Sequence, residues 1–499
     1  MGKFIIEKGM KNLNTAQLKN LLENHFHGNL KLESYKLKTI AAIQFLTFNR
    51  FDLAFKLLYL EMLKSDVDFS KVIYKEHIRA FSLGKFNEPG NDEKNSFDKF
   101  VNNFEETFND IKVNGFDGRK TLIPLSKNGS IANGAHRVAS AIYLNKTVDC
   151  VQIDTNDHTY DYKFFRNRNV SDEILDAVAA TFVEYADNMH IAFLWPTAKG
   201  YDEEIEDIIP NIVYRKEMVL TPNGAHNLLS QIYYGEKWLG SVENDFSGAK
   251  SKLVECFKTF DPIRVVAFQA NSLDEVVKIK DEIREIFNAG KHSVHITDTR
   301  EEALRVARVA FNENGIHFLN YAKPNKYTST HEKIDVFKQF VIENNLNTND
   351  VVLDGGMVLS AYGIRDASDI DYFVDDNIKI NCHGENIECH DKELKYHKEN
   401  KLELIYNPKN YFYFNDLKFI SFKQLYRMKI NRSEAKDVDD RKVMEKLIDF
   451  NFFKKANNKI RQNLFYQKIK IERRIGSFLV KHHLYDMVRD LYRFFMGKK

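Results

Sequence analysis

Residues 351–374 read VVLDGGMVLSAYGIRDASDIDYFV, and this is the most informative stretch of the chain. An apolar run leads through a Gly-Gly turn into a short helix. A second strand follows, with two carboxylates, Asp369 and Asp371, two positions apart. Because side chains alternate along a strand, we expect both acids on one face, with Ile370 and Tyr372 on the other.

Two like charges on one face repel each other unless a cation lies between them. A divalent cation with oxygen ligands, Mg²⁺ or Mn²⁺, is the usual solution. Gly355 and Gly356 leave backbone N–H groups unshielded at the start of a helix, and such groups suit a phosphate. A metal beside a phosphate cradle indicates phosphoryl or nucleotidyl transfer.

The same pattern resembles the polymerase-β-type nucleotidyltransferase superfamily, in which a Gly-Gly or Gly-Ser turn precedes an acid-x-acid strand. The resemblance covers roughly residues 335–450 and includes a helical segment expected over 417–443. It implies that Asp369 and Asp371 bind the metal and that a third catalytic carboxylate stands on a later strand. Glu403, an acid among apolar residues, matches that position best.

The resemblance also implies a nucleoside triphosphate or nucleotide-activated donor as substrate. Gly355, Gly356 and the nearby Ser360 would cradle its outer phosphates. A lysine would neutralise the leaving group, and the candidates are Lys418, Lys429 and Lys436. Catalysis in this class rests on positioning and electrostatics.

A second phosphate-binding pattern lies between residues 75 and 172. A strand and a turn lead to Asn-Gly-Ala-His-Arg at the mouth of an Ala-rich helix, so His136 and Arg137 fall where the helix dipole favours anions. With Gly134, they resemble the Gly-x-His-Arg element of the ParB/sulfiredoxin-like fold, in which this element contacts nucleotide phosphates in several members. In a kinase of this type Glu88 would be the candidate base. A capped turn with solvated charges is the structural alternative.

Residues 173–328 show strand-like runs at 190–195, 212–220, 263–270 and 293–297, with helical patterns between them. This alternation predicts an α/β domain with a partly parallel sheet. His295 and Asp298 follow the last of these strands and form a candidate second site. Thr299 and Glu302 also fit a plain capping box.

Composition describes a globular chain of several domains. It has 499 residues, 43% hydrophobic and 29% charged, with a net charge of +2. We predict a multidomain α/β and α+β protein with five parts: a helical N-terminal region (1–74), a ParB/sulfiredoxin-like domain (75–172), an α/β middle domain (173–328), a nucleotidyltransferase-like α+β domain (329–450) and a basic amphipathic helical tail (451–499).

Cysteine use and apolar runs bear on the compartment. Four scattered cysteines give no disulfide framework, and neither a secretory signal nor a membrane span is visible, so we expect a cytoplasmic protein. The pairs Cys382-His383 and Cys389-His390 flank a predicted hairpin turn at 384–386. They allow a structural zinc site as an alternative to a plain hairpin.

The tail carries thirteen Lys and Arg against three acids, with apolar residues at helical spacing. Two interpretations remain open: contact with the anionic inner face of a membrane, or packing of its apolar side on the preceding domain.

Three functional hypotheses follow. The first is a metal-dependent transferase acting on a sugar, glycan or small phospho-metabolite in bacterial surface polysaccharide biosynthesis, bifunctional if the N-terminal half is kinase-like. The second is a nucleic-acid- or protein-targeting nucleotidyltransferase of toxin or ParB-related type, which the balanced charge of most of the chain disfavours. The third is a non-catalytic nucleotide-binding scaffold.

Overall fold

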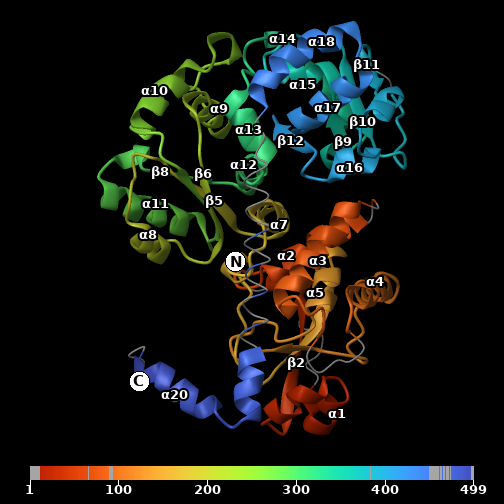
Figure 1. The fold of residues 1–499 in the computed structure, drawn as a ribbon, viewed down its shortest axis with the longest axis vertical. Helices are drawn as coiled ribbons and strands as arrows, with labels where there is room; N and C mark the ends of the chain where they lie inside the picture. Colours follow the sequence, from red (N-terminus) through yellow and green to blue (C-terminus); the bar gives the residue numbers. More distant parts are fainter. Residues whose placement is uncertain are drawn as a thin grey trace.

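The computed structural model of the chain describes residues 12–448 except 64, 66, 89–93 and 383, and in the tail residues 460, 464, 467, 471 and 474–495. It combines many helices with three small sheets (Figure 1). The multidomain α/β character expected from the sequence is therefore confirmed. Within the described ranges, every helix is too short or too polar to cross a bilayer.

The N-terminal unit has a four-stranded sheet in the order β1-β2-β4-β3, with β3 parallel to β4 and the other pairs antiparallel. Its elements are β1 (Asn12–Asn14), α1 (Thr15–Lys19), β2 (Ser34–Ala41), α2 (Asp52–Leu63), α3 (Asp68–Ser82), α4 (Phe97–Asn114), β3 (Ile123–Leu125), α5 (Ala135–Tyr143), β4 (Thr147–Gln152), α6 (Tyr162–Arg166) and α7 (Asp172–Tyr185).

Helix α4 shows how the sequence sets these elements. Ser96 caps its start by accepting a hydrogen bond from Lys99 N–H, and Phe100, Phe104 and Ile111 bury one face at helical spacing. Gly115, with φ of +74°, ends the helix.

The middle unit has a sheet in the order β6-β7-β5-β8, and all of its pairs are antiparallel. Its elements are β5 (Met189–Leu194), α8 (Asp202–Ile208), β6 (Ile212–Met218), α9 (Pro222–Ile232), α10 (Ser247–Cys256), β7 (Ile263–Gln269), α11 (Leu273–Phe287), β8 (Val294–Ile296), α12 (Arg300–Ala310) and α13 (Glu313–Tyr321). The four strands were predicted correctly, but the partly parallel arrangement was wrong, since strand direction depends on connections that local patterns do not reveal.

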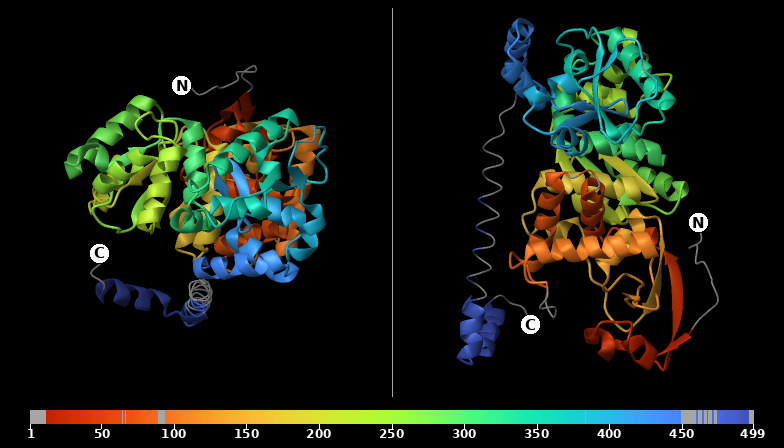
Figure 2. Two further views of the ribbon diagram at one scale, coloured as in Figure 1. Left: turned by 90° about the horizontal axis from the view of Figure 1, so that it is seen from above. Right: turned by 90° about the vertical axis from the view of Figure 1, so that its right-hand side faces the viewer.

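The C-terminal unit has a five-stranded mixed sheet in the order β11-β10-β9-β13-β12. Its elements are α14 (Thr328–Glu343), β9 (Val351–Leu353), α15 (Gly355–Ala361), β10 (Ile370–Val374), β11 (Ile387–Cys389), α16 (Lys401–Tyr406), β12 (Tyr411–Phe414), β13 (Leu417–Ile420), α17 (Phe422–Arg432) and α18 (Ala435–Met444). In the tail, α20 (Tyr485–Phe495) lies outside the three sheets in both views (Figures 1 and 2).

Short 3₁₀ helices connect these elements: η1 (Asn24–Asn29), η2 (Ala42–Phe45), η3 (Val242–Asn244), η4 (Gly290–His292), η5 (Thr348–Asp350), η6 (Asp391–Tyr396) and η7 (Glu445–Leu447).

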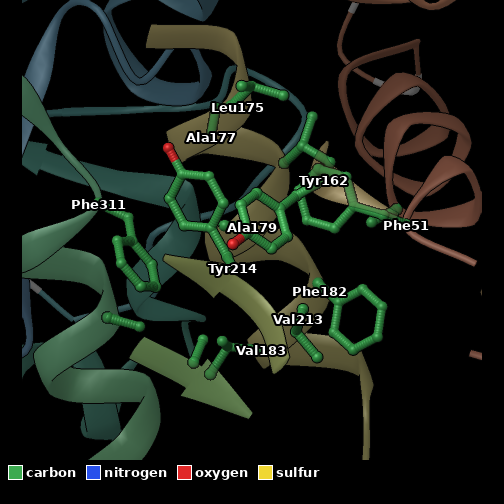
Figure 3. Packing of buried hydrophobic residues seen from close by; sticks show 14 of the residues in the cluster. Phe51, Tyr162, Leu175, Ala177, Ala179, Phe182, Val183, Val213, Tyr214 and Phe311 are labelled. Atoms are coloured by element: carbon green, nitrogen blue, oxygen red, sulfur yellow. The ribbon is translucent and has the colours of Figure 1, made fainter. Parts of the chain in front are cut away.

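One buried cluster extends from Ala42 to Leu319 and so joins the N-terminal and middle units. Its centre is aromatic (Figure 3). Tyr214 on β6 stacks on Phe51 of the N-terminal unit with ring centroids 6.1 Å apart and meets Phe311 edge-on at 5.2 Å. A second cluster, from Phe318 to Met444, forms the core of the C-terminal unit.

The N-terminal region differs from the helical prediction. Residues 34–41 form strand β2, which pairs antiparallel with β4 more than a hundred residues away. That long-range pairing outweighs the local helical pattern. Similarly, the predicted helical segment at 417–443 begins with strand β13 before α17 and α18 follow.

Candidate active site

Strands β9 and β10 lie side by side and antiparallel, with Tyr372 opposite Leu353. The N–H of Asp354 donates to the carbonyl of Asp371 at 2.9 Å, so the Gly-Gly turn directly follows this ladder. Ile370 and Tyr372 are buried in the core, whereas Asp369 and Asp371 are only partly buried. The predicted strand–turn–helix–strand order and the alternation of faces are therefore confirmed.

Both carboxylates lie against the glycine turn. A Cβ on Gly355 would overlap Asp371 Oδ2, and a Cβ on Gly356 would stand 3.7 Å from Asp369 Oδ1. Gly355 also has φ of +57°, a conformation that favours glycine. Gly355 thus makes room for the Asp371 carboxylate, a role that the sequence did not suggest.

Two histidines extend the site. Asp354 is fully buried, and its Oδ2 lies 2.8 Å from His390 Nδ1 and 3.1 Å from His397 Nε2. The other ring nitrogen of His390 is 3.8 Å from Asp371 Oδ2. Asp354 and His397 were not predicted as site residues from the sequence, and His390 was predicted only as a possible zinc ligand. These residues meet through tertiary structure, and the only local signal was an acid directly after a buried strand.

The electrostatics follow from burial and mutual repulsion. Burial raises the pKa of Asp371 to about 6, and the Asp369 and Asp354 carboxylates add to this effect, while His390 opposes it. Burial would also raise the pKa of Asp354, but the two histidines hold it well below its usual range. Burial lowers the pKa of His390, yet pairing with Asp354 and Asp371 raises it overall.

The two carboxylates fit Mg²⁺ bound with an incomplete set of protein ligands. In the part of the chain that the structure describes, no group of three or more His, Cys, Asp or Glu side chains is placed to hold a metal. Mg²⁺ is commonly bound by one or two carboxylates and keeps water or substrate phosphate oxygens as its other ligands. Asp369 and Asp371 would supply such a pair.

Two other predicted residues lie elsewhere. Glu403 stands on helix α16 rather than on a strand, and its carboxylate accepts from Asn407 Nδ2 at 2.7 Å and from Phe69 N–H at 3.4 Å. Ser360 is buried in the second turn of α15, with its hydroxyl 2.6 Å from that of Thr330. The third-carboxylate role and the phosphate-cradle role are therefore not supported for these residues.

The three candidate lysines have other partners. Lys418 is buried and donates to the carbonyls of Asn349 and Ile405, and burial lowers its pKa to about 7. Lys429 is buried between Asp437 and Asp440. Lys436 is exposed and lies 3.3 Å from Glu434.

The side chains of the Gly-x-His-Arg element contact other residues of the N-terminal unit. Gly134 precedes α5 with φ of +89°, as a turn requires. His136 Nε2 lies 2.8 Å from the Tyr74 hydroxyl, and burial holds the pKa of His136 well below its usual range. Arg137 donates to Glu23 at 3.0 Å and to the Thr121 hydroxyl. Internal pairing therefore accounts for both side chains.

The remaining candidates also have partners within the protein. Glu88 pairs with Lys94 at 2.9 Å. His295 Nε2 is 3.0 Å from Glu302 Oε1, Asp298 pairs with Lys280, and Thr299 caps α12 by accepting from Glu302 N–H. The capping role was predicted correctly.

The predicted hairpin at 384–386 is wrong, because the described residues 375–382 before the turn form no strand, and β11 after it pairs in parallel with β10 instead. Cys382 and Cys389 are exposed, and His383 lies outside the described residues. The structure gives the zinc alternative no support, since the imidazole of His390 contacts Asp354 and Asp371 instead.

A cleft of about 1280 Å³ opens where the three units meet. Its walls include Tyr162 and Arg166 from the N-terminal unit, Lys216 from the middle unit, and Gln424 and Arg427 on α17. Asp369, Asp371 and His390 are not part of its lining. This cleft and the acidic site are therefore distinct features of this structure.

Comparisons with protein-family models, with curated proteins and with solved structures find no match to this chain.

Proposed function

We propose that the chain is a metal-dependent nucleotidyl- or phosphotransferase whose reaction takes place beside the Gly355–Gly356 turn. One observation carries the proposal: the carboxylates of Asp369 and Asp371 lie together against that turn. The raised pKa of Asp371 supports it, since burial first and the neighbouring carboxylates second disfavour the ionised form, which a bound cation would stabilise.

The residues of the site have separable tasks in this proposal. Asp369 and Asp371 would hold Mg²⁺, which when bound neutralises charge on the reacting phosphate. Asp354 fixes the His390 ring, whose other nitrogen faces Asp371. The acceptor would be a sugar, a glycan or a small phospho-metabolite.

The test combines ligand binding with turnover. The full-length protein is mixed with Mg²⁺ and a panel of nucleoside triphosphates and nucleotide sugars, and its melting temperature and the release of phosphate or pyrophosphate are measured. We expect Asp369→Asn and Asp371→Asn to remove the Mg²⁺-dependent melting shift and to lower turnover by roughly a thousandfold or more.

Asp366→Asn is the matched control. Asp366 lies three residues from Asp369, but its exposed carboxylate accepts a hydrogen bond from Ser329 and pairs with Lys333. It should therefore behave as the wild-type protein. The proposal fails if Asp371→Asn folds and still turns over substrate at the wild-type rate.

A further inference from the structure

The described residues of the C-terminal tail include exposed apolar side chains at helical spacing. The described residues between 460 and 481 are helical. Six apolar side chains there are each more than half exposed: Ile460, Leu464, Ile471, Ile475, Phe478 and Val480. At 3.6 residues per turn, the first five form an apolar stripe within a sector about 60° wide on one helix face, and Val480 falls on the opposite face. A loop at 482–484 follows, and α20 adds the exposed Tyr485, Met487 and Val488.

The tail also concentrates the positive charge of the chain. Residues 451–499 hold thirteen Lys and Arg against three Asp and Glu, whereas the whole chain has 73 against 71. The rest of the chain is therefore net negative, and the entire positive excess belongs to the tail sequence.

Among the residues that the structure describes, none covers the side chains of this stripe, which stay more than half exposed. No hydrogen bond or ion pair links a described tail residue to the folded units, and Arg489 pairs only with Asp486 and Asp490 in the tail itself. Figure 2 shows α20 away from the sheets in both orientations.

We propose that the tail binds the surface of an anionic lipid bilayer, with the apolar stripe inserted between headgroups and the cations facing lipid phosphates. An amphipathic helix with a basic polar face has the chemistry of such an interfacial segment. A second copy of this chain is a poorer partner, because two paired tails would each bring thirteen cations together with only three acids to complement them.

The experiment uses the full-length protein and flotation with vesicles. One set contains equal parts of phosphatidylcholine and phosphatidylglycerol, and the other contains phosphatidylcholine alone. We expect the protein to float with the anionic vesicles, to bind the neutral vesicles at least about tenfold more weakly, and to be released by high salt.

Phe478→Glu and Ser477→Glu form a matched pair. They change the charge equally at adjacent positions, but Ser477 lies off the apolar stripe. Phe478→Glu should lower binding at least about tenfold, and Ser477→Glu by a much smaller factor. Both variants should keep the wild-type melting temperature, since this face packs on nothing in the folded units.

Three outcomes would overturn the proposal. Equal loss in both variants would mean that charge alone matters and that the stripe does not insert. A lower melting temperature for Phe478→Glu would show that the tail packs on the body. Concentration-dependent dimers that Phe478→Glu abolishes, without vesicle binding, would identify a second copy as the partner.

Discussion

At the scale of single residues, Gly355 carries two separate constraints. It adopts φ of +57°, and any side chain there would overlap the Asp371 carboxylate. Gly290 shares the first constraint, with φ of +54°, but a Cβ there would meet open space. A substitution at Gly290 therefore tests backbone strain alone, whereas the same substitution at Gly355 adds the displacement of Asp371.

We predict that Gly290→Ala lowers the free energy of unfolding by about 1–2 kcal/mol, the cost of a left-handed conformation. Gly355→Ala should lose more than this and should also lose the Mg²⁺-dependent melting shift, because the methyl group displaces Asp371. Chemical denaturation and thermal shift measure the two effects. Equal losses in both variants, with the shift intact, would show that the carboxylate tolerates the methyl group.

The pKa of Asp371 gives a pH-dependent prediction. Because this pKa rises from 3.8 to about 6 on folding, the folded state binds the proton more tightly. Ionisation of Asp371 therefore lowers the free energy of unfolding. This loss is absent below pH 3.8, grows up to about pH 6 and then stays at about 3 kcal/mol. Asp371→Asn removes it, so the variant should be more stable than the wild-type protein above pH 6.

Urea unfolding of both proteins between pH 4 and pH 8, in the presence of EDTA, measures this difference. We expect the two free energies of unfolding to converge near pH 4 and to separate as the pH rises. A difference that stays constant over this range would show that the carboxylate keeps its ordinary pKa in the fold.

The residue scale also shows what the sequence could predict at the site. Asp369, Asp371 and the two glycines belong to one local pattern, so their proximity follows from strand alternation and chain order. His397 is separated from Asp354 by more than forty residues and meets it only after α15, β10 and η6 are placed. Chain-distant partners of this kind leave no periodic signal in the sequence.

At the scale of elements, the sequence predicted the type of most helices and strands but not their pairing. The strands of the middle sheet were expected correctly, yet their direction was not. Glu403 fits a strand by its apolar neighbours, but Asn400 caps a helix there by accepting from Glu403 N–H at 2.9 Å. A short apolar run is compatible with a helix or a strand, so a capping residue such as Asn400 can favour the helix.

Helix α2 contains a buried ionic network that makes an element-scale prediction. Asp52 in its first turn accepts from Arg50 at 2.8 Å and from Lys56 at 3.1 Å, and Lys56 Nζ lies 3.1 Å from His77 Nε2. Burial lowers the pKa of Lys56 to about 8, although Asp52 opposes this. The carboxylate therefore balances two cations that have almost no contact with water.

Asp52→Asn should lower the free energy of unfolding by about 3–5 kcal/mol, because it leaves Arg50 and Lys56 buried without a counter-charge. Asp439→Asn removes an exposed partner of Lys442 and should cost less than about 1 kcal/mol. Guanidinium denaturation of the two variants makes the comparison. Similar small losses in both would show that water or a rearrangement compensates the buried cations.

At the scale of the whole molecule, two buried clusters meet at helix α13. Leu319 belongs to the cluster shared by the N-terminal and middle units, and Phe318 belongs to the C-terminal cluster. The helix therefore joins two cores, and the cleft at the junction of the three units lies along it. A chain with more than one core need not unfold in one cooperative transition.

Asn314 on α13 links the two clusters by donating from Nδ2 to the carbonyls of Pro408, Lys409 and Tyr411 in the C-terminal unit at 3.0–3.2 Å. Asn314→Ala leaves these carbonyls without that donor, at a cost of about 1–3 kcal/mol. Because the loss falls on the junction, differential scanning calorimetry should show two transitions separated by a few degrees more than in the wild-type protein. Asn114→Ala, which removes only an exposed bond to Asp110, should leave the profile unchanged. A single transition that shifts as a whole in Asn314→Ala would mean that the two clusters unfold as one unit despite their separate side chains.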